Sequence, residues 1–246
     1  MRHPADSPTP TLDDLEAARI AYEAREPSDL FYRAATELVE RMLPDDSPLE
    51  LGTKYVDRRV WQDAPLNLAE SLAVLLRTWN AAFYRFHERF DDKHLNKING
   101  LVESYGPQLW ALRRRSIATL SNDDEESVRS LFAAFAEVLG QVGAAKALHL
   151  LAPHFFPLWD TAIAELIYHV HMKKRGFNAA GYWTFMNKVK EQCDRLGDIG
   201  RNPLKALDEY NYIQSHPSLR GTTRLTRILS GEFSCCCSPY SASPAS

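Results

Sequence analysis

Apolar residues recur at helical spacing along most of this chain, and this pattern constrains the fold more than any other feature. In residues 67–87 the predicted buried stripe is spaced three or four residues apart and contains Leu68, Leu72, Leu75, Leu76, Trp79, Phe83 and Phe86. That spacing places side chains on one face of a helix, whereas a half-buried strand alternates with a period of two. We therefore predict an all-α, multi-helix bundle with little or no sheet.

Capping and breaking residues divide the pattern into segments. Ser28 and Ser121 are suitable N-caps, Asn67 with Glu70 resembles a capping box, and Gly140 is suited to end a helix. We expect helices over residues 12–26, 28–43, 67–87, 92–103, 107–117, 121–139, 143–152, 160–171, 179–196, 203–214 and 222–229.

The same signals predict three regions. Residues 1–48 form an N-terminal helical extension that ends in a Pro-Asp-Asp-Ser-Pro break. Residues 49–232 form a helical domain with room for two lobes, and residues 233–246, rich in Ser, Cys, Pro and Ala, form a disordered tail.

Charge and cysteine content restrict the function. The formal net charge is -3, so DNA binding requires a local basic face. The basic clusters that could provide one are Arg113-Arg114-Arg115, Lys173-Lys174-Arg175, and Arg220 with Arg224 and Arg227. The four cysteines, Cys193 and Cys235 to Cys237, do not have zinc-site spacing, and no run approaches about 18 apolar residues. We expect a cytoplasmic location, no membrane, and neither metal nor cofactor.

Residues 139–163 contain the most informative motif, LGQVGAAKALHLLAPHFFPLWDTAI. It predicts a helix end, a tight turn, a short apolar helix from Gly143, a proline-bounded loop and a new helix beginning at Asp160. Amides at a helix N-terminus bind anions, so the turn is suited to one DNA phosphate. The predicted DNA contacts are Gln141, Gly143, Ala144, Ala145 and Lys146.

This segment resembles the active-site region of the helix-hairpin-helix DNA glycosylases. Their hairpin reads Leu-Pro-Gly-hydrophobic-Gly-x-x-Thr-Ala, and a Pro-x-x-Asp-Thr element follows it. The matching residues are Leu139, Val142, Gly143 and Ala147 in the hairpin at 139–147, and Pro157, Asp160, Thr161 and Ile163 beyond it. The chain departs from the pattern at Gly140 and Gln141, and it has Lys146 one position after the nucleophilic lysine of lyase-type members.

The resemblance implies a DNA N-glycosylase that flips a modified base from double-stranded DNA into a pocket. It implies that the Asp160 carboxylate stabilises the positively charged sugar and orients water, with Lys146 as a second candidate catalytic residue. A monofunctional enzyme is favoured over a lyase because Lys146 is out of register, and a monomer is favoured. The candidate pocket residues are Trp159, Phe155, Phe156 and Trp79.

Simpler interpretations remain open. Asp160 has the position of a helix N-cap, and His149 and His154 fit structural roles. We expect Glu165, Asp208 and Glu209 to be solvated. The chain could instead be a non-catalytic helix-hairpin-helix module for DNA binding or adaptation, or a helical protein-interaction domain. The sequence does not identify the base, so DNA repair and antiviral defence against modified phage DNA are both open.

Overall fold

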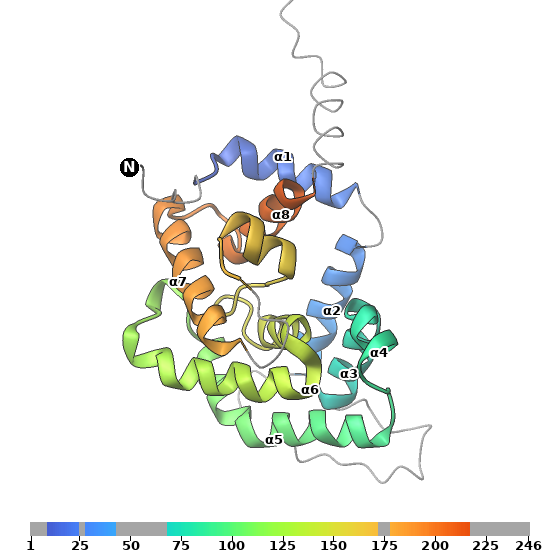
Figure 1. The fold of residues 1–246 in the computed structure, drawn as a ribbon. Helices are drawn as coiled ribbons and strands as arrows, with labels where there is room; N and C mark the ends of the chain where they lie inside the picture. Colours follow the sequence, from blue (N-terminus) through green and yellow to red (C-terminus); the bar gives the residue numbers. More distant parts are fainter. Residues whose placement is uncertain (1–8, 25–27, 43–67, 172–177, 217–246) are drawn as a thin grey trace, which may run out of the picture.

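The computed structural model describes residues 9–24, 28–42, 68–171 and 178–216, and within these ranges every regular element is a helix. The predicted all-α bundle is confirmed for this part of the chain. Helices α5 and α6 lie side by side at one end of the molecule, and α1 and α8 pack together at the other (Figure 1).

The helices follow the order of the apolar pattern, with short 3-10 turns η1 and η2 before α6 and a π-helical turn η3 after it. Their bounds are α1 Leu12–Glu23, α2 Ser28–Met42, α3 Leu68–Trp79, α4 Ala81–Phe86, α5 Asp92–Arg113, η1 Ile117–Thr119, η2 Asn122–Asp124, α6 Glu125–Leu151, η3 Ile163–Ile167, α7 Ala179–Leu196 and α8 Pro203–Ser215.

Side-chain caps fix several of these starts. The Thr11 hydroxyl and the Asp14 carboxylate form a reciprocal capping box at α1. Ser121 and Asp124 form a second one ahead of α6, in agreement with the predicted cap. Such boxes satisfy backbone N–H groups that the first helical turn leaves without partners.

Helix α6 runs through the core and bends sharply at Gly140. This residue has φ 69° and ψ 164°, and helical backbone resumes at the next residue. A side chain is strongly disfavoured in this region of backbone space, so glycine is required here. The predicted break at Gly140 is confirmed, but the predicted start of the next helix at Gly143 is wrong, because Gly140 alone makes the turn and helical backbone resumes at Gln141.

The predicted single helix over 67–87 is also wrong, because it breaks at Asn80 (φ −120°, ψ 38°). The Asn80 side-chain amide donates to the Leu139 carbonyl at 3.2 Å. A sharp bend disturbs the backbone hydrogen bonds of a helix, and the Asn80 amide is a side-chain donor to a carbonyl next to the bend. The predicted buried face does not continue to the end of this segment, since its last member, Phe86, is 69% exposed.

Two other predicted boundaries change. Residues 92–113 form one helix that contains Pro107, not two helices. Leu101 and Leu109, on either side of the proline, are both buried, and this burial offsets the lost backbone hydrogen bond. The helix predicted over 160–171 is shorter, because it passes into the π-helical turn Ile163–Ile167 and ends there.

The core joins α6, α7 and the loop before Asp160. Phe132 stacks on Tyr182 with ring centroids 4.1 Å apart, and the Trp159 ring meets Phe132, Tyr182 and Phe185 edge-on. The segment Asn122–Leu151 is long and apolar enough to cross a membrane, but 56% of its apolar window is buried inside the protein. A buried core helix accounts for that composition.

Several sequence predictions lie outside the described residues. These are the boundary near residue 48, the helix over 222–229, the tail over 233–246 with Cys235 to Cys237, and the basic clusters at 173–175 and 220–227.

Replacing Gly140 with alanine is expected to destabilise the fold. The required backbone conformation costs a non-glycine residue about 1–3 kcal/mol, and the new Cβ would lie 2.9 Å from the Phe83 ring. Urea denaturation of Gly140→Ala measures the loss. Gly100→Ala is the matched control, because nothing lies within 4 Å of its Cβ position in α5, and alanine there stabilises a helix by about 0.5–1 kcal/mol. Equal stability of the two variants would contradict the assignment.

Candidate functional site

Asp160 lies at the start of the helical turn that follows the core loop, and it is half-buried. One carboxylate oxygen, Oδ1, accepts a hydrogen bond of 2.7 Å from the Ile163 backbone N–H. This is N-cap geometry, as the simpler interpretation of Asp160 expected. It occupies only one of the two oxygens, so the cap and a chemical role are compatible.

Lys146 lies on the second half of α6 and is also half-buried. Its Nζ donates to the Trp79 carbonyl at 2.5 Å and lies 4.9 Å from the centre of the Trp79 ring. Burial lowers the pKa of Lys146 to about 8, while the Asp208 and Asp160 carboxylates act in the opposite direction. Burial therefore favours the neutral amine of Lys146 more than that of an exposed lysine.

The Asp160 carboxylate is one of two whose charge raises the pKa of the Lys146 ammonium. The sequence left this open, because Lys146 is displaced by about 100° around a helix from the lyase position. The bend at Gly140 reorients the second half of α6, and the carboxylate of Asp160 is close enough to raise the pKa of the Lys146 ammonium.

Asp208, on α8, is the site residue that sequence reasoning missed. We expected it to be solvated, but its side chain is only 13% exposed, and its Oδ2 lies 3.4 Å from the Lys205 Nζ. Burial is the main cause of its raised pKa, and the Asp160 and Glu209 charges contribute. The available signal was Lys205 three residues earlier, a spacing at which opposite charges can pair on one helix face.

Lys205 links the Asp208 carboxylate to helices α1 and α2. Its ammonium lies 4.0 Å from the Tyr22 ring centre and 4.2 Å from that of Tyr32, and both rings are buried. It also pairs with Glu209, whose other oxygen meets Arg201 at 2.6 Å. The expectation that Glu209 is solvated is wrong, since the residue is 4% exposed.

His149 lies one helical turn beyond Lys146 and is fully buried. Its Nδ1 is 2.7 Å from the Phe156 carbonyl, and its Nε2 is 2.8 Å from the Tyr32 hydroxyl. A carbonyl only accepts, so Nδ1 carries the hydrogen and Nε2 accepts from Tyr32. Burial lowers the pKa of His149 to about 4, which fits a neutral structural histidine.

Three of the four predicted pocket aromatics lie in the core. Trp159 is 1% exposed, and Phe155 and Phe156 are completely buried. These three residues belong to the loop that precedes Asp160. Their rings pack into the core and do not line an opening in this conformation. Trp79 is the exception, because it is half-buried and contacts Lys146.

The predicted phosphate contacts are mostly covered. Gly143, Ala144 and Ala145 are buried, and a Cβ on Gly143 would meet the Asn80 side-chain nitrogen at 2.6 Å. Gln141 remains half-exposed. Any anion contact at this helix start is therefore limited to the first residues after the bend.

Two residues of the triple arginine have structural partners. Arg113 donates to the Leu151 carbonyl at 3.0 Å, and Arg115 forms a two-pronged pair with Asp124. Arg114 is exposed and its guanidinium stacks on the Trp110 ring at 5.0 Å. Within the described residues, this cluster therefore offers one exposed cation to DNA.

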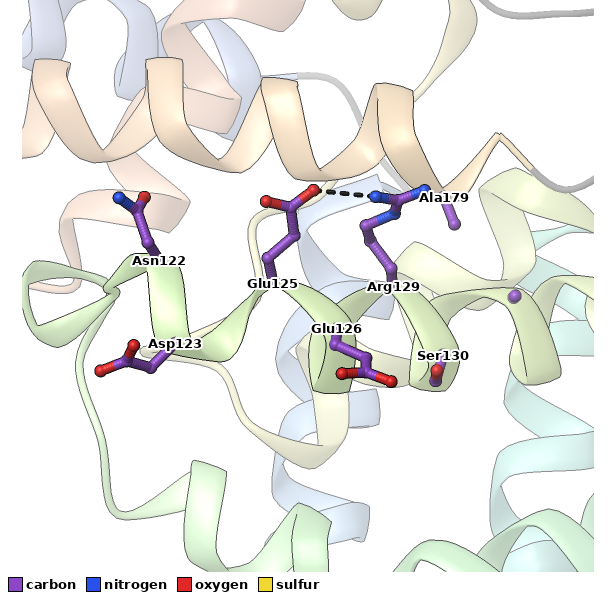
Figure 2. A pocket seen from close by; sticks show the side chains of 8 residues that line it. Asn122, Asp123, Glu125, Glu126, Arg129, Ser130 and Ala179 are labelled. Atoms are coloured by element: carbon purple, nitrogen blue, oxygen red, sulfur yellow. Dashed lines mark hydrogen bonds and ion pairs between the residues drawn. The ribbon is translucent and has the colours of Figure 1, made fainter.

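An open groove lies away from these residues, where α6 and α7 begin (Figure 2). Asp123, Glu125 and Glu126 line it, and Glu125 turns toward Arg129 in an ion pair of 2.8 Å. Its negative charge repels phosphate, so this groove does not suit the DNA backbone.

The described ranges contain no group of three or more His, Cys, Asp and Glu side chains arranged to hold a metal ion. Comparison with protein-family models, with curated proteins and with solved structures gave no match. Any function assigned to this chain therefore comes from its own residues, chiefly Lys146 and Asp160.

His149 makes the stability of the fold depend on pH. Its pKa is about 4 when folded, below the ordinary value of 6.5, so its contribution is complete above pH 6.5 and is lost as the pH falls toward 4. The maximal slope is about 1.4 kcal/mol per pH unit.

Chemical denaturation at pH 7 and pH 5 measures this loss. His149→Gln retains a donor and an acceptor but does not titrate, so its stability is expected to fall less between the two pH values. The exposed His171→Gln is the control and should keep the wild-type slope. Identical slopes in all three proteins would remove His149 as the cause.

Proposed function

We propose that this chain is a DNA N-glycosylase whose reaction centre is formed by Lys146 and Asp160. The observation that carries the proposal is a half-buried amine, with its pKa lowered to about 8, in the electrostatic field of the Asp160 carboxylate. Both residues belong to the segment that resembles the helix-hairpin-helix glycosylases, and both lie beyond the bend at Gly140.

The state of Lys146 supports an amine nucleophile. A lysine with an ordinary pKa is almost fully protonated at pH 7 and cannot attack carbon, whereas desolvation produces reactive lysines. The sequence favoured water as the nucleophile because of the register of Lys146. The lowered pKa instead supports attack by Lys146 at the sugar C1′, with release of the base.

Asp160 has a complementary role in this proposal. Bond breaking leaves positive charge on the sugar ring, and a fixed carboxylate stabilises that charge. The hydrogen bond from the Ile163 N–H holds the carboxylate in place and leaves Oδ2 for the sugar. This arrangement is preorganised, since the helix cap exists before DNA binds.

The base would have to leave the DNA stack to reach these groups. Trp79 is the candidate to stack on it, being half-buried and next to Lys146. The proposed substrate is an altered base in double-stranded DNA. The reaction would serve either base-excision repair or defence against phage DNA that contains modified bases.

The proposal predicts base release from duplex oligonucleotides that carry a panel of oxidised, alkylated, deaminated and hypermodified bases. Alkaline cleavage detects the abasic product, and borohydride reduction traps a covalent complex if the Lys146 amine attacks. Lys146→Met should abolish trapping, and Asp160→Asn should slow base release by about 100-fold or more.

Matched controls are Lys97→Met and Asp123→Asn, which remove an exposed lysine and an exposed aspartate near a helix start. Both should retain wild-type activity. Base release with unchanged rate in Asp160→Asn would contradict the role of this carboxylate, and trapping that persists in Lys146→Met would place the nucleophile elsewhere.

The Asp160 carboxylate accepts a hydrogen bond from the Ile163 N–H of its own helical turn, as a purely structural N-cap does, and this favours a second candidate, a non-catalytic helical module for DNA binding or adaptation. Such a module would bind duplex DNA with an affinity that falls steeply with salt, yet release no base from any member of the panel. Absence of salt-dependent binding would leave a helical protein-interaction domain.

A further inference from the structure

Two exposed phenylalanine rings lie close together in the sequence, one at the end of α4 and one in the segment that joins α4 to α5. Phe86 is 69% exposed and Phe90 is 42% exposed. Helix α4 lies at the edge of the molecule, beside α3 (Figure 1). Isolated apolar residues are common on protein surfaces, so these rings indicate a partner only if their surroundings also fit one.

An arginine precedes each of these rings. The pair Arg85-Phe86 recurs four residues later as Arg89-Phe90, and both arginines are exposed. The Arg85 guanidinium lies 5.9 Å from the centre of the Phe86 ring. Because five residue steps span at most about 18 Å, the two rings and the two cations form one local patch. We call these four residues the arginine–phenylalanine patch.

The patch carries positive charge that the neighbouring acids do not neutralise. No described carboxylate forms an ion pair with the guanidinium of Arg85 or Arg89. Two nearby acids are already engaged, since Glu88 lies 3.6 Å from the Lys97 Nζ and Asp91 accepts a hydrogen bond of 3.0 Å as the N-cap of α5. The chain has a net charge of -3, but this patch attracts anions.

The buried Tyr84 ring holds the patch in place. Phe90 packs edge-on against this ring, with ring centroids 5.7 Å apart, and the Tyr84 hydroxyl lies 3.0 Å from the His94 Nε2 of α5. The exposed Arg77 lies 5.7 Å from the centre of the same ring and adds a third cation beside the patch. A surface that is ordered before binding loses less entropy when a partner binds.

These features fit single-stranded nucleic acid better than other anionic partners. Unpaired bases have flat faces that stack on aromatic rings, and the phosphates between them pair with arginines. In duplex DNA the neighbouring base pairs cover those faces, so exposed rings have little to stack on. A membrane surface favours a continuous apolar face, whereas here each ring alternates with charged residues.

We propose that the arginine–phenylalanine patch binds single-stranded nucleic acid. Bases stack on the Phe86 and Phe90 rings, and the two arginines hold the phosphates. The proposal goes beyond the glycosylase activity, because it requires neither Lys146 nor Asp160.

The test is fluorescence anisotropy of a labelled oligothymidine about 12 nucleotides long, measured with the full chain at several salt concentrations. The wild type is expected to bind, with an affinity that falls as the salt concentration rises. Phe86→Ala should weaken binding by about 5-fold or more, because one stacking contact is lost. Arg89→Gln should reduce the slope of log affinity against log salt by about 0.7.

The ring and the charge each have a matched control on α1. Leu12→Ala removes an apolar side chain that is 63% exposed, and Arg19→Gln removes an exposed arginine. Both variants should bind the oligothymidine as the wild type does. Phe86→Trp retains a stacking ring and should keep or exceed the wild-type affinity. Circular dichroism establishes that each variant is folded before the titration.

Three further ligands identify the partner. Oligouridine of the same length shows whether RNA or DNA is the preferred single strand, and binding of either supports the proposal. Phe86→Ala should leave the affinity for a duplex of this length unchanged, and an equal loss for duplex and single strand would contradict stacking. Vesicles of phosphatidylserine and phosphatidylcholine test for a membrane. Co-sedimentation that is lost in Phe86→Ala, without oligonucleotide binding, would replace the proposal with a lipid surface.

Failure of this inference is distinguishable from failure of the proposed function. Oligonucleotide binding that depends on Phe86, in a protein that releases no base, retains the inference alone. A wild type that binds neither oligonucleotide overturns the inference, and so do equal affinities of the wild type and Phe86→Ala, whether or not the protein releases bases from duplex DNA.

Discussion

The backbone of Gly140 is the constraint on which the rest of the structure depends. A positive φ at this residue lets one apolar stretch form two helical halves with different directions. The first half places Phe132 against Tyr182 of α7, and the second carries Lys146 to Trp79 of α3 and His149 to Tyr32 of α2. The Phe83 ring packs against Gly140 and the Asn80 amide binds the Leu139 carbonyl, so the break at Asn80 and the helix α4 that follows lie directly against this bend.

Several of the buried polar groups of the protein lie on or near the second half of α6. His149 joins Tyr32 of α2 to the Phe156 carbonyl, and Lys205 of α8 lies between Tyr22 and Tyr32. Helices distant in sequence are thus joined by hydrogen bonds and cation–π contacts in addition to apolar packing. The proposed reaction centre lies at the edge of this network, where burial changes from complete to partial.

Local signals predicted much of this fold. Periodicity and caps gave α7 its observed bounds and placed the ends of α1, α2 and α8 within three residues. Errors arose where a distant partner decided the local structure. Asn80, where the predicted helix breaks, donates to the distant Leu139 carbonyl, and Lys205, the partner of Asp208, is covered by the distant Tyr22 and Tyr32 rings. Neither partner is visible from spacing alone, whereas Asp160 was recognisable because its cap lies within three residues of it.

The π-helical turn Ile163–Ile167 acts as a spacer between two fixed points. At one end Asp160 caps the chain, and at the other the Tyr168 hydroxyl binds Gln192 and Asn211 inside the bundle. An ordinary α-helix turns by about 100° per residue. With that geometry the Tyr168 side chain would point in a different direction around the helix axis. A chain shortened by one residue here would have to release one of these attachments. The length of this short segment therefore helps to set the direction of the Asp160 carboxylate. It matters for that direction as much as the identity of any residue in the segment.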